Sequence, residues 1–314
     1  MSESSEKKQI AILLVVVTLI GMAGLFLTGG FSNIIGICTF GCGDVYVDSY
    51  SADLYLNGTL EETFVYRIEE SDTYRMLYRN WKVPLSYGSP GDKTTSWGIT
   101  VGKTPHVELI TIDSPDGAIP YIKDFQENTT ILSDSNQEYA SQVSSLASMN
   151  EAGGYKSDRF KAGTYRIRYV FKVFPPFECD SEYCHLNLKL TDDHLPYDRV
   201  TVTIHDPDGF ISQVFVHSLA QEVRKERETW IITGASSQDS LLGIEMLLNP
   251  KIIEVMQGFP KSVPGVKEKT LSANERYSTG SLIYRTLKAT VFLIPVILAL
   301  MYYKFGREKS FTVP

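Results

Sequence analysis

Polar and apolar residues alternate in several short segments in the middle of the chain, which is typical of strands with one buried face. Residues 164–174 place five large apolar side chains on one side: Tyr165, Ile167, Tyr169, Phe171 and Val173. Similar patterns occupy residues 44–56, 63–68, 185–190 and 199–205. The Asn57-Gly58 pair between the first two of these is a strong hairpin signal. The pattern predicts a mainly β fold, an antiparallel β-sandwich.

Residues 133–161 interrupt this pattern. The segment is polar, rich in serine and contains Gly153-Gly154, so it is predicted to be an insertion or loop between two β regions, with a short helix over 138–149. Residues 218–228 are a second helix candidate, and residues 239–257 are expected to form a strand or a helix pair that leads into a linker.

Both ends of the chain are strongly apolar. Residues 10–27 carry no charge and, with their flanks, reach the roughly 20 residues that a membrane span needs. The run is longer than that of a signal peptide and no A-x-A cleavage site follows it, so a retained anchor is favoured over a cleaved leader. Residues 282–303 form the second expected span, with Pro295 inside it; a buried core helix is the alternative.

Positive charges set the expected orientation. Lys7 and Lys8 precede the first span, and Lys304, Arg307 and Lys309 follow the second. The positive-inside rule then predicts a two-pass protein of the cell membrane, with both termini cytoplasmic and the central domain extracytoplasmic. The expected order is tail 1–8, helix 9–30, β region 31–132, insertion 133–161, β region 162–257, linker 258–281, helix 282–303 and tail 304–314.

Composition narrows the function classes. The 314 residues have a net charge of −7 and a pI near 5.4. No basic stripe with interleaved aromatic residues is present, so no nucleic-acid partner is expected. The 18 Tyr and 15 Phe fit a sheet-rich fold, because aromatic side chains pack well on pleated surfaces.

The four cysteines form two local pairs in the sequence, Cys38 with Cys42 and Cys179 with Cys184. In an exported domain they are expected to form disulfides, and the sequence leaves three connectivities open. The spacing does not fit a zinc site. The stretch from Cys179 to His185 partly matches a haem-attachment motif, which gives an electron-transfer or metal-binding alternative.

Few residues suggest a binding site. Asn57 and Asn128 lie in glycosylation sequons. A cationic and aromatic cluster that could bind a ligand is formed by Arg75, Arg79 and Trp81. Such a run is more often a strand edge with solvated arginines. The Asp and His residues over 192–208 fit turn chemistry better than a metal site. No metal or cofactor is expected, and because no catalytic motif is found, the chain is predicted not to be an enzyme.

Five stretches resemble a family of predicted membrane proteins, domain of unknown function 2207: residues 55–62, 75–79, 163–169, 198–204 and 302–309. The resemblance implies a β-sandwich outside the membrane, followed by a membrane helix. It implies no functional residue, because the family has no established activity. Members of the family often continue further, so this chain is expected to be a short member or a fragment.

These observations predict a non-enzymatic interaction or assembly module of the cell envelope or of a membrane complex. Its expected partners are the lipid bilayer and another membrane or envelope protein, and the oligomeric state is left open. A surface sensor or ligand-binding domain is a further alternative.

Overall fold

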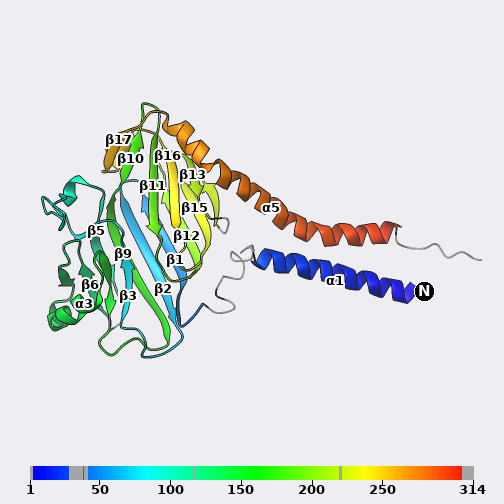
Figure 1. Cartoon of the computed structure of the whole chain (residues 1–314), viewed down its shortest axis with the longest axis horizontal. Helices are drawn as coiled ribbons and strands as arrows, with labels where there is room; N and C mark the ends of the chain where they lie inside the picture. Colours follow the sequence, from blue (N-terminus) through cyan, green and yellow to red (C-terminus); the bar gives the residue numbers. More distant parts are fainter. Residues whose placement is uncertain (1–2, 28–37, 39–41, 116, 219–220, 306–314) are drawn as a thin grey trace, which may run out of the picture.

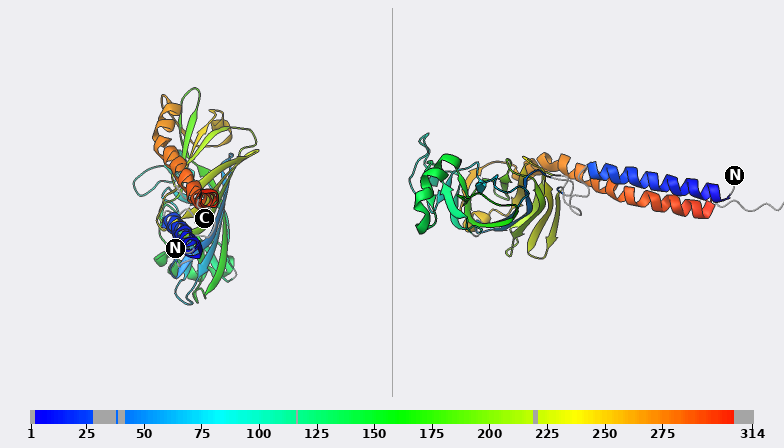
Figure 2. Two further views of the ribbon diagram at one scale, coloured as in Figure 1. Left: turned by 90° about the vertical axis from the view of Figure 1, so that its right-hand side faces the viewer. Right: turned by 90° about the horizontal axis from the view of Figure 1, so that it is seen from below.

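The computed structural model describes residues 3–27, 38, 42–115, 117–218 and 221–305. A β-rich domain lies at one end of the molecule (Figure 1). Two long helices, α1 (Glu3–Leu27) and α5 (Val266–Phe305), extend from it side by side, as Figure 2 also shows.

The two apolar segments of the sequence lie in these helices. In the described part of the chain, no helix combines the length and the apolar content that a membrane crossing requires. The spans over 9–30 and 282–303 therefore stay predictions. Residues 28–30 of the first span and 306–314 of the last tail lie outside the described residues.

The largest sheet has eight strands and contains most of the segments that alternate in the sequence. Its strands, in spatial order, are β14 (Gln221–Glu226), β15 (Thr229–Ser236), β12 (Tyr197–His205), β1 (Val45–Tyr55), β2 (Thr59–Ile68), β9 (Gly163–Phe174), β5 (His106–Asp113) and β4 (Leu85–Tyr87). The predicted hairpin joins β1 to β2. Gly58 has φ +93° in its turn, and an added Cβ would lie 2.9 Å from the Val173 carbonyl oxygen, so this position requires glycine.

The second sheet packs against the large one and completes a sandwich. Its order is β13 (Ile211–Val216), β16 (Leu242–Leu248), β11 (Cys184–Thr191), β10 (Pro176–Cys179) and β17 (Phe259–Ser262). Inward-facing side chains of both sheets share one core, for example Leu60 and Phe64 of β2 with Leu186 and Leu190 of β11. The alternation of residues 164–174 is confirmed, since Ile167 and Phe171 are among its fully buried side chains.

A third sheet of four strands has a small core of its own with α3 (Ala140–Leu146). Its order is β3 (Met76–Asn80), β8 (Glu151–Tyr155), β6 (Ile119–Lys123) and β7 (Thr129–Ile131). The remaining short helices are η1 (Val101–Lys103), η2 (Asp134–Tyr139) and α4 (Ile252–Val255).

Strand direction differs in part from the antiparallel prediction. Three neighbouring pairs run parallel: β1 with β12, β4 with β5, and β10 with β17. The strands of each pair are separated by long stretches of chain. Parallel pairing needs such a connection, because the chain must return to the starting end of the first strand before it can run in the same direction again.

Several predicted segments take a different form. The boundary over 133–161 does not separate two sheets, because β1 and β2 from before it pair with β12 and β9 from after it. That polar segment also supplies β8, which is buried throughout. Residues 221–226 of the helix candidate 218–228 form a strand, since β15 offers them a full antiparallel partner. The linker over 258–281 contains β17 and the start of α5.

Candidate functional site

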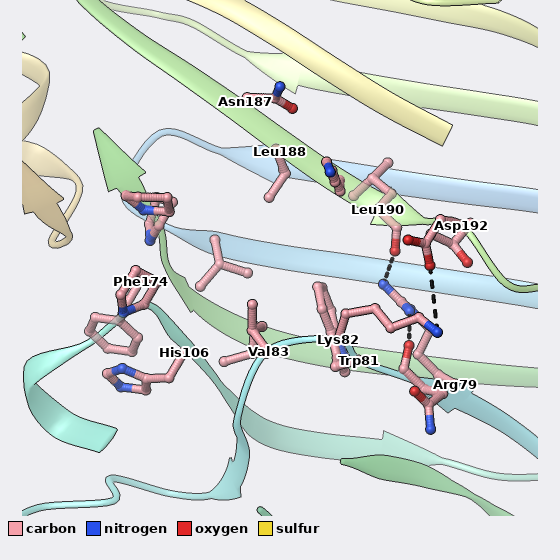
Figure 3. Close-up of a pocket in the computed structure, with 18 of the residues that line it drawn as sticks. Arg79, Trp81, Lys82, Val83, His106, Phe174, Asn187, Leu188, Leu190 and Asp192 are labelled. Carbon is pink, nitrogen blue, oxygen red and sulfur yellow. Dashed lines mark hydrogen bonds and ion pairs between the residues drawn. The ribbon is translucent and has the colours of Figure 1, made fainter. Parts of the chain in front are cut away.

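A cleft of about 560 Å³ opens between the two sheets of the sandwich. Residues 79–83, at the end of β3 and just after it, lie on one side of it, and residues 187–193 of β11 and the following turn lie on the other (Figure 3). The start of β5 and the passage from β9 to β10 close one end. Apolar residues line most of the walls, and this size is in the range of ligand-binding sites.

A buried ion pair forms the inner end of the cleft. Arg79 Nε lies 3.1 Å from Glu62 Oε2, and the side chains are only 4% and 1% exposed. The Tyr50 hydroxyl donates to Glu62 Oε1 at 2.5 Å. The remaining Arg79 nitrogens donate to the backbone carbonyls of Asn80 and Leu190. Arg79 therefore ties β2 and β3 to β11 across the sandwich.

Burial governs the protonation of this centre. It raises the pKa of Tyr50 well above its ordinary value, and the adjacent Glu62 carboxylate adds to that effect, so the phenol stays neutral. Burial alone would lower the pKa of Arg79, but the Glu62 charge and the neighbouring tyrosines outweigh it and raise the pKa. Arg79 is therefore a charged residue with a fixed structural partner.

Trp81 forms the floor next to this pair. The Arg79 guanidinium lies 3.9 Å from the centroid of the Trp81 ring, a cation–π contact. The ring also packs edge-on against Phe171, with centroids 5.2 Å apart. Trp81 is 4% exposed, and its Nε1 has no hydrogen-bond partner among the described residues. The floor is thus rigid and apolar, with one buried donor left over.

The rim of the cleft is charged. Lys82 Nζ lies 3.2 Å from Asp193 Oδ2 and 3.8 Å from Asp192 Oδ1, and all three side chains are exposed. At the opposite end the buried His106 ring stacks on Phe174, with centroids 4.4 Å apart. Ion pairs as exposed as those of Lys82 contribute little stability, so the rim can rearrange around a partner at small cost.

The sequence cluster of Arg75, Arg79 and Trp81 is only partly one site. Arg79 and Trp81 line the cleft, but Arg75, just before β3, is not part of the lining and donates to the Ser157 carbonyl oxygen. Solvated arginines are therefore the wrong expectation for Arg79. Glu62 was not identified from the sequence as a partner of Arg79. The alternating pattern of β2 indicates its burial, because Glu62 is in phase with the buried Leu60 and Phe64.

The cysteines form two local disulfides, Cys38–Cys42 and Cys179–Cys184. The second closes the β10–β11 hairpin, so neither of its sulfurs is a thiolate. His185 lies 3.6 Å from the carboxylates of both Glu178 and Glu245. No group of three or more His, Cys, Asp and Glu suited to a metal ion occurs within the described residues.

The same hairpin holds the first turn of α5. Asp180 Oδ2 accepts a hydrogen bond from the Val266 amide at 2.8 Å, and Lys267 lies over the Tyr183 ring. About two turns further on, Asn274 Nδ2 donates to Glu245 Oε2 of β16 at 2.6 Å. Asp180 therefore caps the helix from another part of the chain, and α5 is seated firmly on the second sheet.

We expect acid to weaken this cap. Hydrogen bonds from the Glu182, Tyr183 and Val266 amides lower the pKa of Asp180. A lowered folded-state pKa means that the stabilisation is complete above the unfolded pKa of about 3.9 and is lost as the pH falls through the folded value. Amide exchange over residues 266–270, corrected for intrinsic rates, will therefore accelerate as the pH is lowered below the unfolded pKa.

The Asp180→Ala variant separates this cap from general acid unfolding. It should show the faster exchange already at neutral pH and little additional change in acid. Glu182→Ala, in the same loop, should behave like the parent. Equal protection of 266–270 in Asp180→Ala and the parent at neutral pH would contradict the cap.

The two sequons lie in exposed turns. Asn57 Oδ1 accepts from the Thr59 amide in the β1–β2 hairpin, and Asn128 bonds to Asp124 before β7. Both side chains are at the surface, and glycosylation of either stays a prediction.

No curated protein matches the sequence. Similar solved structures include an M1 zinc metallopeptidase from Deinococcus radiodurans, with a TM-score of 0.31, and yeast LTA4 hydrolase with bestatin, with a TM-score of 0.34. Each is 9% identical over 66% and 68% of this chain, which spans 43% and 30% of their lengths. These values are too low to carry over a fold or an activity.

A family model, by contrast, covers most of the β domain. It spans residues 46–248, from the start of β1 to the end of β16, and is described as the N-terminal domain of a predicted membrane protein. This match confirms the resemblance found in the sequence. The chain belongs to the DUF2207 family of predicted membrane proteins, whose N-terminal domain it contains.

Proposed function

We propose that this chain is a non-enzymatic, membrane-anchored module that binds another membrane or envelope protein in the cleft between its sheets. The observation that carries the proposal is the cleft itself. It combines apolar walls, a floor fixed by the Glu62–Arg79 pair and a rim of exposed charges. Protein-binding surfaces commonly pair an apolar centre with a polar rim.

Anchoring by the two helices supports the same role. Apolar side chains of both helices are exposed, including Ile12, Leu19 and Ile20 of α1 and Leu300 of α5. Contact with lipid would cover them. A domain held at a membrane meets neighbouring membrane proteins at a raised effective concentration, so even a modest cleft affinity suffices.

Photocrosslinking of the full chain in its native membranes tests the proposal. A benzophenone amino acid replaces Val83, a half-buried cleft residue, and in a matched control it replaces the exposed Arg166 on β9. We expect a discrete adduct with one membrane or envelope protein, identified by mass spectrometry, at position 83 only. No adduct at 83, or the same adducts at both positions, would refute the proposal.

A ligand site formed by Arg75, Arg79 and Trp81 has less support. Arg79 already has a carboxylate partner and Arg75 lies elsewhere. The electron-transfer alternative has less support too, because Cys179 and Cys184 are bonded to each other and neither sulfur is available to a haem or a metal ion.

A further inference from the structure

Strand β11 presents its edge to the cleft. The cavity is lined by every residue from 187 to 193 in turn. Side chains of a strand alternate between its two faces, and here Leu188 and Leu190 are buried whereas Asn187 and Lys189 are exposed. A cavity that touches consecutive residues therefore lies beside the backbone of the strand.

This edge is open because the neighbouring strand is short. On one side β11 pairs with β16 from Cys184 to Thr191. On the other side β10 pairs only with Cys184 and His185. The chain enters β10 through Pro175 and Pro176, which have no amide hydrogen to donate to a ladder. Beyond His185, no described strand pairs with this side of β11.

The hydrogen-bond alternation identifies the groups that are left open. Glu178 and His185 are directly paired, and the Asp180 amide donates to the Tyr183 carbonyl at the hairpin end. In an antiparallel ladder this directs the backbone groups of His185 toward β10 and those of Leu186 and Leu188 toward β16. The backbone N–H and C=O of Asn187 and Lys189 then face the cleft.

The open stretch has definite ends. His185 closes one end through β10, and Arg79 closes the other by donating to the Leu190 carbonyl oxygen. Outside the ladder that β11 forms with β16, no described residue is hydrogen-bonded to the backbone of Asn187 or Lys189. These two residues are about 6.8 Å apart along the strand, which is the repeat that another extended chain offers.

We infer that the cleft receives an extended segment of the partner protein as an added strand on β11. This inference rests on the proposed function and specifies its partner. Backbone pairing with Asn187 and Lys189 fixes the segment in place. Alternate side chains of the segment point between the sheets toward Val83 and Trp81, so they are apolar, and the intervening side chains face solvent and are polar.

An extended peptide fits these groups better than a compact ligand. The open edge offers backbone N–H donors and C=O acceptors at the spacing of a strand. An added strand can form hydrogen bonds with both kinds of group. The cleft wall gives specificity through alternate side chains, as in other cases of peptide addition to a sheet edge.

The test uses heptapeptides selected from a random displayed library against the full chain in detergent. The tightest-binding peptide is then synthesised in two N-methylated forms, one at odd and one at even positions. An added strand directs only one of these sets of amides toward β11. We expect one form to lose at least about tenfold in affinity, which corresponds to about 1.4 kcal/mol, and the other to bind like the parent peptide.

Variants of the protein test the same hydrogen bonds from the side of β11. Lys189→Pro removes an amide that the ladder alternation directs toward the cleft and not toward β16, so peptide affinity should fall about tenfold. Lys189→Ala keeps that amide and should bind within about twofold of the parent. Val83→Arg fills the cleft and should abolish binding.

The outcomes separate the two proposals. Loss of binding in Val83→Arg, with full binding by both methylated peptides, would overturn strand addition and leave the cleft as the binding site. Full binding by Val83→Arg, or a library without binders, would overturn both. The methylated peptides act on the unchanged protein, so a folding defect in Lys189→Pro does not obscure the result.

Discussion

Replacing Glu62 with alanine will lower the free energy of unfolding by about 3–5 kcal/mol, because the Arg79 charge would stay buried without its carboxylate. Such a loss is a large part of the roughly 5–15 kcal/mol that stabilises a typical domain. Chemical denaturation of the detergent-solubilised chain, followed by tryptophan fluorescence, measures it. Trp81 lies against Arg79 and makes a suitable reporter.

The adjacent residue provides the control. Glu61 on the same strand pairs with Arg168 at 2.6 Å, but that pair is exposed. Glu61→Ala should therefore cost under about 1 kcal/mol. The double variant Glu62→Leu with Arg79→Met should recover at least half of the loss, since apolar residues often replace a buried ion pair at little cost. Equal losses in Glu61→Ala and Glu62→Ala would show that burial does not distinguish the two pairs.

The Phe171→Ala variant will be destabilised by about 3–5 kcal/mol through the loss of a fully buried ring and the cavity that replaces it. Phe171 supports the floor of the cleft from below through its edge-on contact with Trp81. It also stacks on Tyr169, with centroids 5.5 Å apart. Loss of the ring removes both contacts, so we expect a lower midpoint in thermal and chemical denaturation.

Two measurements make this prediction specific. Lys172→Ala, one residue along β9 and on its outer face, should change the free energy of unfolding by less than about 1 kcal/mol. At temperatures where Phe171→Ala is folded, its Trp81 fluorescence should shift because the ring has lost a neighbour. A loss below about 1 kcal/mol in Phe171→Ala would mean that the core closes over the vacated space.

Together these variants connect the core to the proposed binding role. The Glu62–Arg79 pair, Trp81 and Phe171 form a continuous support beneath the cleft. The cap of α5 by Asp180 lies in the hairpin that begins β11. A partner strand on β11 would therefore bind next to the element that holds the helix.

Periodicity made the strands predictable. The segments around Tyr165–Val173 and the Asn57-Gly58 turn form a strand and a hairpin as expected, because a period of two and a turn with positive φ are local properties. Residues 221–226 show the limit of such arguments. Their charged sequence is compatible with a helix, but pairing with β15 decides for a strand.

The cleft was only partly predictable. Arg79 and Trp81 were identified together, since they are near each other in the sequence and of suggestive type. Glu62 was missed, although its phase in β2 marks it as inward-facing, and a buried acid needs a buried base. The open edge of β11 has no sequence pattern of its own, because it depends on where β10 stops.

By itself, the sequence determined the β-rich class, the apolar ends and the family, all of which follow from residue type and near-neighbour spacing. The tertiary structure alone decided that strands from both sides of residues 133–161 share one sheet, that the buried Arg79 is paired with Glu62 and that β11 has an open edge. Those features depend on contacts between residues far apart in the chain, and no local pattern specifies which distant groups will meet.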